Sequence, residues 1–599
     1  MADAAGESAP ESGPTRSERV PLSLKLWYGA PSFAGAAMTI PIAIHMTKFY
    51  SDVVLVPLGF LGIAIAVARA FDAISDPVVG FLSDRTRTRW GRRRPWMLFG
   101  APVCAVFFYL LFTPPPELGA RDAIVWFTAT FLLYSLAHTV YVIPHYALGP
   151  ELTLDYHERS TLFGVREGFV ILGTVVAALL PGLLTARLGD ERETFAIFAF
   201  AFGITLTILY TGLSIVVRER PDFYERAPSP FVPGIRRALR NRPFRVLLST
   251  YVVASIPAAI PGTLMPYFNE YVIRPDNPPL WLAIFLGAYF GAGFLFLPAW
   301  VWAARHFGKR PTWLVSFAMG ITGGFGMFFL GEGDTTALLV LLLWAGSAFG
   351  AGLFLGPAIQ ADVIDYDELH TGKRREAQYA AFWSILPKFV VIPSAAIPIA
   401  FLGSLGYKPN VPQTPDVVLA IKALFALAPA FFSALSFFIA WRLPIDENVH
   451  RAILRGVEAH RRGESAPDPL TGQMLAPHAS REVPEDTAWY LDHFSAGELR
   501  RTLAKGPGSL VRDVALSAAG SFALCVAMAL FVVRHVSDLH VEPGPLAVLA
   551  VVVSGVSLSA TAFHLMRLGA ARRFAAHAVP AKLVETHLAI AGYRRTGAA

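Results

Sequence analysis

The sequence predicts an all-α polytopic membrane protein built from two six-helix bundles, with an extra C-terminal two-helix hairpin. The first observation is composition, because 54% of the 599 residues are hydrophobic and only 16% are charged, with a mean hydropathy of +0.48. A soluble chain of this size carries nearer a quarter charged residues. The second is that apolar residues fall in blocks of about 20, the length that spans a hydrocarbon core. The third is an internal repeat.

Apolar blocks form two sets separated by a polar segment, and these sets are the expected bundles. The blocks lie near residues 25–50, 57–82, 96–113, 124–148, 165–186 and 194–217, and then near 245–269, 280–304, 311–330, 336–358, 379–404 and 417–442. The motif "TRWGRRRPW" follows the second block, and "RHFGKRPTW" follows the eighth. Likewise, "LGPELTLDYHERS" follows the fourth block and "LGPAIQADVIDYDEL" the tenth. Two related bundles around a central site are a transporter architecture.

Domain boundaries follow from these blocks and from the polar stretches between them. We expect a disordered cytoplasmic tail (1–22), an N-terminal six-helix bundle (23–217), a central cytoplasmic loop (218–244), a C-terminal six-helix bundle (245–442), a cytoplasmic linker (443–512), a transmembrane hairpin (513–567) and a cytoplasmic tail (568–599). The alternative for the hairpin is a pair of helices that lie on the membrane surface.

The basic residues indicate orientation. They gather in alternate loops between apolar blocks, which is typical of cytoplasmic loops and places both termini in the cytoplasm. We expect an integral protein of the plasma (inner) membrane. The formal charge of +7 therefore does not point to nucleic acid as a partner. The two cysteines both lie in apolar blocks, and phosphate-binding loops, HExxH and GxSxG are absent. We expect no enzyme activity and no cofactor other than a coupling cation.

Two carboxylates occupy the second apolar block. Asp72 and Asp76 are four residues apart, so they project from one face of a helix, with Ser75 beside them. Pro77 lacks an N–H group and leaves a backbone carbonyl around position 73 without its helical donor. Carboxylate, hydroxyl and carbonyl oxygens suit a small hard cation or a proton. An Asp at the centre of a membrane helix costs about 2.5–3.5 kcal/mol on insertion scales, so it needs a partner.

The alternative is an ion-pair network in which Arg69 and Lys388 neutralise the two acids. Lys388 is a lone cation in the eleventh block. It either pairs inside the bundle or extends to the membrane surface. A lysine that releases the acids when the cation binds would satisfy both interpretations.

Other polar residues in the blocks are candidates for substrate binding or gating. The substrate-binding candidates are His138, Tyr141, His145, Tyr146 and Arg166. For either histidine, a hydrogen-bonded core position is an equal alternative. The gating candidates, at a helix end and in the following loop, are Asp84, Arg92 and Arg93. Ion pairs there are expected to hold the bundles in one state.

The stretch "VARAFDAISDPVVGFLSDRTRTRWGRRRPW" resembles the second helix and following loop of the glycoside–pentoside–hexuronide:cation symporters, a branch of the major facilitator superfamily that includes melibiose permease. Further segments resemble the same family: "KLWYGAPSF", "YVIPHYALGPELTLDYHERSTLFGVR", "ADVIDYDELHTGKRREAQYAAFWSILPKF" and "LGYKPNVPQTPDVVLAIKALFALAP". Together they cover roughly residues 24–460. The resemblance implies the major facilitator fold and uptake of a small-molecule substrate driven by Na⁺, Li⁺ or H⁺.

The resemblance also implies roles for individual residues. The implied cation-binding residues are Asp72, Ser75, Asp76 and Thr139, and Lys388 and Arg166 match basic residues of the family. Ser75 stands where melibiose permease has an asparagine. Ala36 and Val142 stand where it has sugar-binding acids, and Tyr146 stands where it has a tryptophan.

We therefore expect a cation-coupled sugar-type symporter whose substrate is a glycoside or uronide. Animal sodium-dependent lysophosphatidylcholine symporters share the paired-aspartate helix, so an amphipathic lipid is the alternative substrate. The alternative from another class is a membrane sensor or scaffold derived from a transporter. The C-terminal extension lies outside the resemblance.

Overall fold

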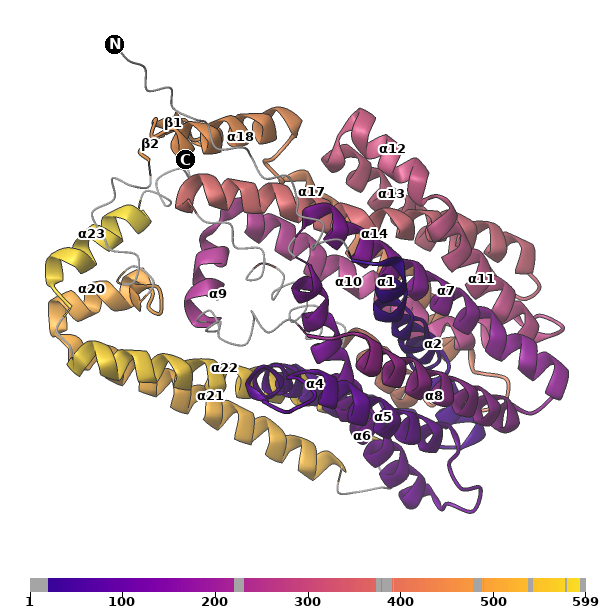
Figure 1. The fold of residues 1–599 in the computed structure, drawn as a ribbon. Helices are drawn as coiled ribbons and strands as arrows, with labels where there is room; N and C mark the ends of the chain where they lie inside the picture. Colours follow the sequence, from indigo (N-terminus) through magenta and orange to yellow (C-terminus); the bar gives the residue numbers. More distant parts are fainter. Residues whose placement is uncertain are drawn as a thin grey trace, which may run out of the picture.

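The computed structural model describes residues 20–153, 155–219, 231–372, 379, 390, 393–477, 487, 490–536, 542–576 and 579–592. Nearly all secondary structure in this part of the chain is α-helical (Figure 1). Eleven of its helices are long and apolar enough to cross a membrane, by length and composition. The polytopic helical prediction is confirmed.

The N-terminal bundle begins with a broken first helix. Its pieces meet at short interruptions around Ala30 and His45, beside Pro31 and Pro41. The elements of this bundle are α1 (Leu22–Gly29), α2 (Pro31–Ile44), α3 (Met46–Lys48), η2 (Phe49–Val53), α4 (Leu58–Arg85), α5 (Arg94–Phe112), α6 (Ala120–Leu152), α7 (Tyr156–Leu188) and α8 (Glu191–Val216).

The C-terminal bundle repeats this plan after a short connecting helix. Its elements are α9 (Phe231–Arg240), α10 (Arg242–Phe268), η4 (Asn269–Ile273), α11 (Pro278–Leu295), α12 (Leu297–Phe307), α13 (Lys309–Phe328), α14 (Thr335–Thr371), a helix over Pro393–Ser404, α16 (Pro415–Lys422), η5 (Ala423–Leu427) and α17 (Ala428–Trp441). The predicted eighth helix is two pieces, α11 and α12, which meet at Phe296.

Two helices extend beyond the apolar blocks that predict them. Asp155 caps α7 by accepting a hydrogen bond from the Glu158 N–H at 2.8 Å, so α7 begins nine residues before the block. The acidic stretch after the tenth block, which lies beyond the apolar residues, is the buried end of α14. Its Asp362 pairs with Lys309 at 2.7 Å, within the C-terminal bundle. Paired charges allow a helix to continue past its apolar part.

Each repeated loop motif contains a glycine in a conformation that other residues rarely adopt. Gly91 and Gly308 both adopt positive φ, +113° and +90°, just before the first residues of α5 and α13. Gly91 also lies against Glu219, because a Cβ atom there would come within 2.6 Å of the Glu219 carboxylate. That carboxylate accepts the backbone N–H groups of Arg92, Arg93 and Arg94 and so caps α5.

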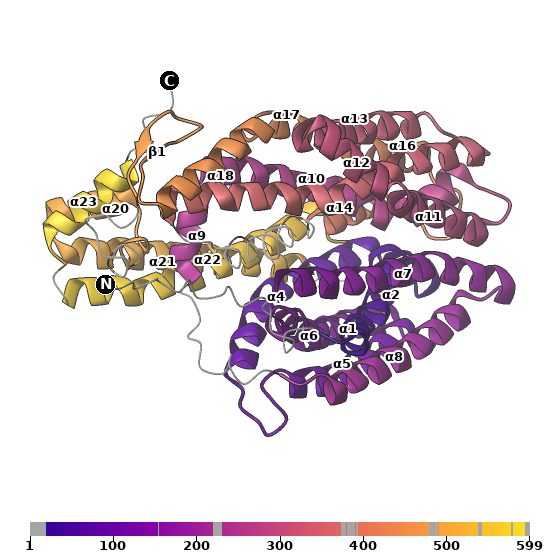
Figure 2. The same ribbon diagram turned by 45° about the horizontal axis from the view of Figure 1, so that its top comes forward.

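Residues after α17 fold back onto the bundles. They form α18 (Glu447–Arg461), the two-stranded β1 (Ala466–Pro467) and β2 (Met474–Leu475), α20 (Ala496–Lys505), α21 (Pro507–Val536), α22 (Pro545–Ala576) and α23 (Ala581–Gly592). The helices α21 and α22 run side by side, as both views show, and Ser554 contacts Cys525 between them (Figure 2). Both are long and apolar enough to cross a membrane, so the expected hairpin is present.

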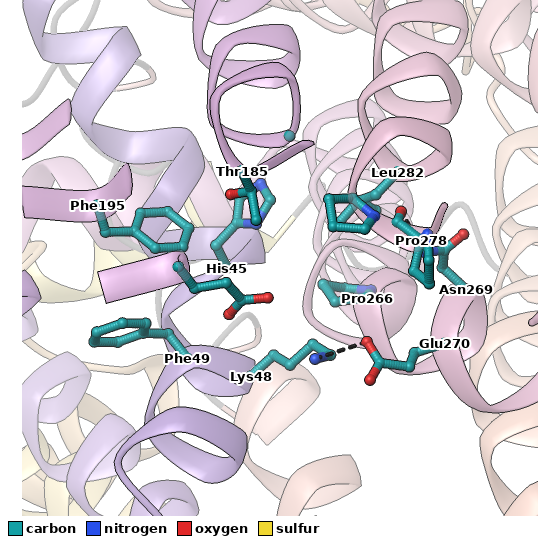
Figure 3. Close-up of a pocket in the computed structure, with 13 residues that line it drawn as sticks. His45, Lys48, Phe49, Thr185, Phe195, Pro266, Asn269, Glu270, Pro278 and Leu282 are labelled. Carbon is teal, nitrogen blue, oxygen red and sulfur yellow. Dashed lines mark hydrogen bonds and ion pairs between the residues drawn. The ribbon is translucent and has the colours of Figure 1, made fainter. Parts of the chain in front are cut away.

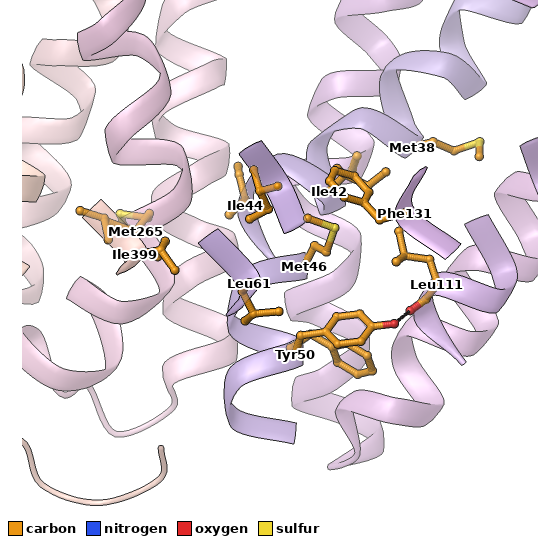
Figure 4. Packing of buried hydrophobic residues seen from close by; sticks show 14 of the residues in the cluster. Met38, Ile42, Ile44, Met46, Tyr50, Leu61, Leu111, Phe131, Met265 and Ile399 are labelled. Atoms are coloured by element: carbon orange, nitrogen blue, oxygen red, sulfur yellow. Dashed lines mark hydrogen bonds between the residues drawn. The ribbon is translucent and has the colours of Figure 1, made fainter. Parts of the chain in front are cut away.

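One hydrophobic core joins both bundles (Figure 4). It contains Met38 and Leu61 from the N-terminal bundle together with Met265 and Ile399 from the C-terminal bundle. Within the N-terminal bundle, the buried Tyr50 hydroxyl donates a 2.6 Å hydrogen bond to the Leu111 carbonyl. This core positions η2 for the polar contacts described next.

A buried polar network, the Asp52 cluster, joins the bundles at the end opposite to the basic loops. Asp52 is 5% exposed and accepts hydrogen bonds from Ser51, Tyr271 and Tyr407 at 2.6–2.8 Å. Lys48 pairs with Asp52 at 3.1 Å and reaches Glu270 of the other bundle at 2.9 Å. We call this the Asp52 end.

The bundles diverge toward the other end, where the 86–93 loop and α9 lie, which we call the basic-loop end (Figure 2). Contacts between α7 and α11 also fall toward the Asp52 end. A Cβ atom on Gly182 of α7 would lie 2.4 Å from the Pro279 carbonyl oxygen, at the start of α11. The structure is therefore closed at the Asp52 end.

Replacing Asp52 should open that end. In Asp52→Asn, the lysine and both phenols lose an ionised acceptor. Breaking a buried ion pair of this kind costs about 3 kcal/mol, which is roughly a 100-fold change in an equilibrium. Pulsed electron paramagnetic resonance between spin labels at Glu117 and Thr336, with Cys104 and Cys525 replaced by alanine, should show a longer distance. Asp276→Asn, an exposed change in a nearby loop, is the control. Unchanged distances in the Asp52 variant would contradict the prediction.

Candidate cation and substrate sites

The two carboxylates of α4 face a matching pair of hydroxyls on α6. Ser135 donates to Asp72 at 2.5 Å, and Thr139 donates to Asp76 at 2.8 Å. Both pairs are four residues apart on their helices, so the contacts form two rungs of one ladder between α4 and α6. Asp72 and Ser135 are buried. The ladder places four oxygen-bearing side chains, two of them carboxylates, in one helix interface.

The remaining predicted members of the cation site have different positions. Ser75 is buried, and its hydroxyl donates to the backbone carbonyl of Asp72 at 3.4 Å. Arg69 approaches Asp72 at 3.4 Å and lies over the Phe131 ring, with 38% of its side chain exposed. Lys388 lies outside the described residues.

His145 is built into the packing of the N-terminal bundle. It is 1% exposed, and its two ring nitrogens lie 2.9 Å from the Tyr28 carbonyl oxygen and 2.9 Å from the Tyr210 hydroxyl. Tyr28 in turn packs so closely on Gly149 that a Cβ atom there would lie 2.1 Å from its hydroxyl. With both nitrogens engaged, His145 matches the core interpretation better than direct substrate binding.

Tyr141 is likewise fully buried, between the rings of His138 and Tyr210. His138 differs, because its ring is partly exposed and packs on Tyr134 and Tyr141. His138 lies on α6 between Ser135 and Thr139, the two hydroxyl residues of the ladder. Of Tyr141 and His138, only His138 is partly exposed.

Tyr146 and Arg166 form an accessible pair. Tyr146 is 52% exposed, and the Arg166 guanidinium lies over its ring at 5.1 Å and over the Phe163 ring at 5.2 Å. Arg166 also pairs with Glu167, its exposed neighbour on α7. The ladder and Tyr146 share one side of α6, because helical spacing connects Ser135, Thr139, Val142 and Tyr146. Arg166 lies within the third turn of α7 rather than at its start.

The predicted gating residues meet at the basic-loop end. Arg93 pairs with Asp84 at 2.9 Å and with Glu151 at 2.8 Å, and Arg92 pairs with Glu151 at 2.8 Å. These ion pairs join α4, α5 and α6 within the N-terminal bundle, whereas the sequence suggested contacts between bundles. Their gating role remains a prediction.

A small cavity lies between the bundles at the Asp52 end (Figure 3). Its volume is about 40 Å³, and His45 and Lys48 face Asn269 and Glu270 across it. Ligand pockets for small molecules are usually about 300–1,000 Å³. This cavity holds no more than a few waters, as expected for the closed end.

Sequence reasoning missed Ser135 and the Asp52 cluster. Ser135 had a signal, because it precedes Thr139 by the same four residues that separate Asp72 from Asp76. Lys48 and Asp52 are also four residues apart. Their partners Tyr271 and Tyr407 carry no comparable signal, because they lie more than 200 residues away.

Comparison with known proteins gives a consistent result. A model of the family described as "MFS/sugar transport protein" matches residues 27–447. The glucuronide carrier protein homolog of Escherichia coli is 25% identical over 70% of this chain and 92% of its own length. The sodium-dependent lysophosphatidylcholine symporter 1 of Mus musculus is 24% identical over 76% of this chain and 91% of its own.

Solved structures agree on the fold. The crystal structure of the nucleoside transporter NupG matches with a TM-score of 0.51 at 13% identity, over 72% of this chain and 99% of the transporter. The family match covers more than half of the chain and spans both bundles. The chain therefore belongs to the MFS/sugar transport protein family, and its motifs are those of the glycoside–pentoside–hexuronide symporters within the major facilitator superfamily.

Proposed function

We propose that this protein is a cation-coupled symporter that works by alternating access, with Asp72 and Asp76 as the cation site. The observation that carries the proposal is the ladder of two carboxylates and two hydroxyls between α4 and α6. Carboxylate and hydroxyl oxygens are ligands for Na⁺ and Li⁺, and a carboxylate can also take up a proton. With the basic loops in the cytoplasm, the open end faces inward.

The substrate proposal rests on the accessible side chains near the ladder. Arg166 offers a planar guanidinium that pairs bidentately with carboxylate or phosphate oxygens. The partly exposed Ala36 and Val142 provide apolar surface where acidic anchors for a neutral sugar would be needed. We therefore favour an anionic glycoside such as a uronide, as the name of the glucuronide carrier relative also suggests.

An amphipathic, phosphate-bearing lipid is the second candidate. Arg166 would bind the phosphate of the lipid, and the apolar surface at Ala36 and Val142 would contact part of its acyl chain. The mouse relative, by its name a lysophosphatidylcholine symporter, supports this alternative.

The cation site is tested by Asp72→Asn and Asp76→Asn. A membrane potential of 100 mV contributes about 2.3 kcal/mol per charge, which supports roughly 50-fold accumulation. Both variants should lower the accumulation ratio in vesicles to near one, because the amide keeps the shape but not the charge. Asp122→Asn, at an exposed site of the same bundle, is the control. Full accumulation by both variants would rule out the site.

Ser135 tests the geometry of the ladder. Ser135→Ala removes the hydroxyl that contacts Asp72, and a hydrogen bond to a charged group contributes about 1.5–3 kcal/mol. The apparent cation affinity should fall at least about tenfold while the maximal rate changes little. Ser83→Ala, whose hydroxyl bonds to its own helix, is the matched control. Equal cation affinities in the two variants would exclude Ser135 from the site.

Substrate class is tested by uptake under imposed Na⁺, Li⁺ and H⁺ gradients. Uronides or lysophospholipids should be taken up faster than neutral galactosides, and Arg166→Gln should remove that preference. Strong Na⁺-driven uptake of melibiose would contradict the role of Arg166. Failure of folded protein to move any of these compounds under any gradient would favour the sensor or scaffold alternative.

A further inference from the structure

The C-terminal extension, described over residues 443–477, 487, 490–536, 542–576 and 579–592, contacts both bundles. Its longest element, α22, has 32 residues and is therefore about 48 Å long. One part of α22 lies along α4 of the N-terminal bundle, and the other approaches α9, beside α20 and α23 (Figure 1). The two attachments differ in chemistry.

The attachment to α4 is a close contact of small residues. The Gly59 N–H donates to the Glu542 carboxylate at 2.7 Å, and a Cβ atom on Gly59 would lie 2.3 Å from the Pro543 carbonyl oxygen. Further along, a Cβ atom on Gly555 would lie 2.8 Å from the Ala70 Cβ atom. Small residues let two membrane helices approach closely, where packing holds them together.

The attachment to α9 is a buried network of charges. Asp492 is 1% exposed and forms ion pairs with Arg237 and Arg240 of α9. Glu498, on α20, accepts two hydrogen bonds of 2.6 Å from Arg567 of α22, which is 2% exposed. Arg236 of α9 lies 3.8 Å from Glu498, and Arg567 of α22 donates a 2.9 Å hydrogen bond to the backbone carbonyl of His493, next to Asp492. One cluster of charges therefore joins α9 to α22.

Both carboxylates are ionised at neutral pH. Burial by itself would raise the pKa of Asp492, but His587, 3.3 Å away, and the charges of Arg240 and Arg237 hold that pKa well below its usual value. Burial likewise opposes ionisation of Glu498, and Arg567 outweighs it to lower the pKa. Removing the partners would leave a buried charge, so the network resists separation.

The connecting helix is itself fixed to the C-terminal bundle. Asn241, between α9 and α10, is 5% exposed, and its side-chain amide donates to the Val363 carbonyl and the Tyr379 hydroxyl at 3.2 Å. Its carbonyl oxygen accepts the Phe244 N–H and caps α10. Through α9, the charged attachment therefore holds α22 to the C-terminal bundle.

We propose that the extension is an internal brace that favours the state open at the basic-loop end. A helix of this length does not fold up, and it is attached to one bundle near the Asp52 end and to the other near the basic-loop end. When the bundles rock to close the basic-loop end, α22 must slide on α4 or the charged network must separate. Either event costs free energy, whereas the state open at the basic-loop end requires neither. The proposal rests on alternating access, but not on which ion or substrate is carried.

The test breaks the brace at its charged attachment. Spin labels at Arg87, in the 86–93 loop, and at Arg305, on α12, report the opening of the basic-loop end; both sites are exposed. The native cysteines are replaced by alanine, and the protein is measured without added cation or substrate. Asp492→Asn combined with Glu498→Gln should raise the ratio of short to long label-to-label distances at least about tenfold, relative to the labelled protein with the intact charge network.

A second variant reaches the same contact from the other side. Arg237→Gln with Arg240→Gln removes the partners on α9 and should give the same shift. Asp513→Asn, which removes only the more exposed pair with Arg501 on the same extension, should leave the distances unchanged. Unchanged distances in either folded variant, or an equal shift in the control, would overturn the proposal. Loss of folding in both variants would also overturn it, because the network would then serve folding alone. Because the readout requires no transport, failure of the brace and failure of the cation site are distinguishable.

Discussion

A charge in the apolar interior of a membrane protein must find partners, and this constraint explains most of the polar architecture here. Asp52, Asp72 and Asp492 all lie where few waters reach them, and each is surrounded by donors. The donors differ. Asp72 accepts a hydrogen bond from the neutral Ser135 hydroxyl, and Arg69 lies at the edge of hydrogen-bond distance. In the proposed mechanism, a cation or proton takes the place of these donors. Asp52 and Asp492 instead form ion pairs with basic side chains, Lys48 and Arg240, and these pairs are stable connections.

The strength of a buried connection comes from the cost of breaking it. A paired charge adds little net stability over an apolar pair, yet an unpaired one costs several kcal/mol. When two elements can adopt two arrangements, a buried charge cluster between them favours the arrangement that keeps its charges paired, because separating the charges costs free energy. The Asp52 cluster crosses the seam between bundles, and the Asp492 network joins the extension to α9.

Sequence patterns predicted the spans and the repeat because hydrocarbon thickness sets helix length. They predicted helix ends poorly, because ends depend on individual contacts. Asp155 caps α7, which therefore starts earlier in the sequence than its apolar block. The ion pair of Lys309 with Asp362 allows α14 to continue to Thr371. The carboxylate pair was predictable from its four-residue spacing. Predicting its hydroxyl partner Ser135 would have required a comparison of the residue spacing on two helices. The role of Asp492 depends on a contact with a residue 255 positions away, which no local pattern predicts.

The repeat explains why motion between bundles should be rigid. In the N-terminal half, Arg93 at the start of α5 reaches Glu151 near the end of α6. In the C-terminal half, Lys309 at the start of α13 reaches Asp362 near the end of α14. Each half thus ties its third helix to its fourth at the basic-loop end. Bundles braced in this way move as bodies against one another, as in other transporters built from repeats.

One helix connects the separate parts of this machinery. Along its 28 residues, about 42 Å, α4 carries Gly59 against the extension, then Asp72 and Asp76 against α6, and then Asp84 against Arg93. The backbone hydrogen bonds of a helix resist stretching; Pro77 cannot make one of them, and α4 remains one helix across that position. A cation bound at the proposed site would draw Asp72 and Asp76 toward itself, and the shift of α4 would reach the contact with the extension and the ion pairs of the basic-loop end. This arrangement would connect the proposed cation site mechanically to both ends of the transporter.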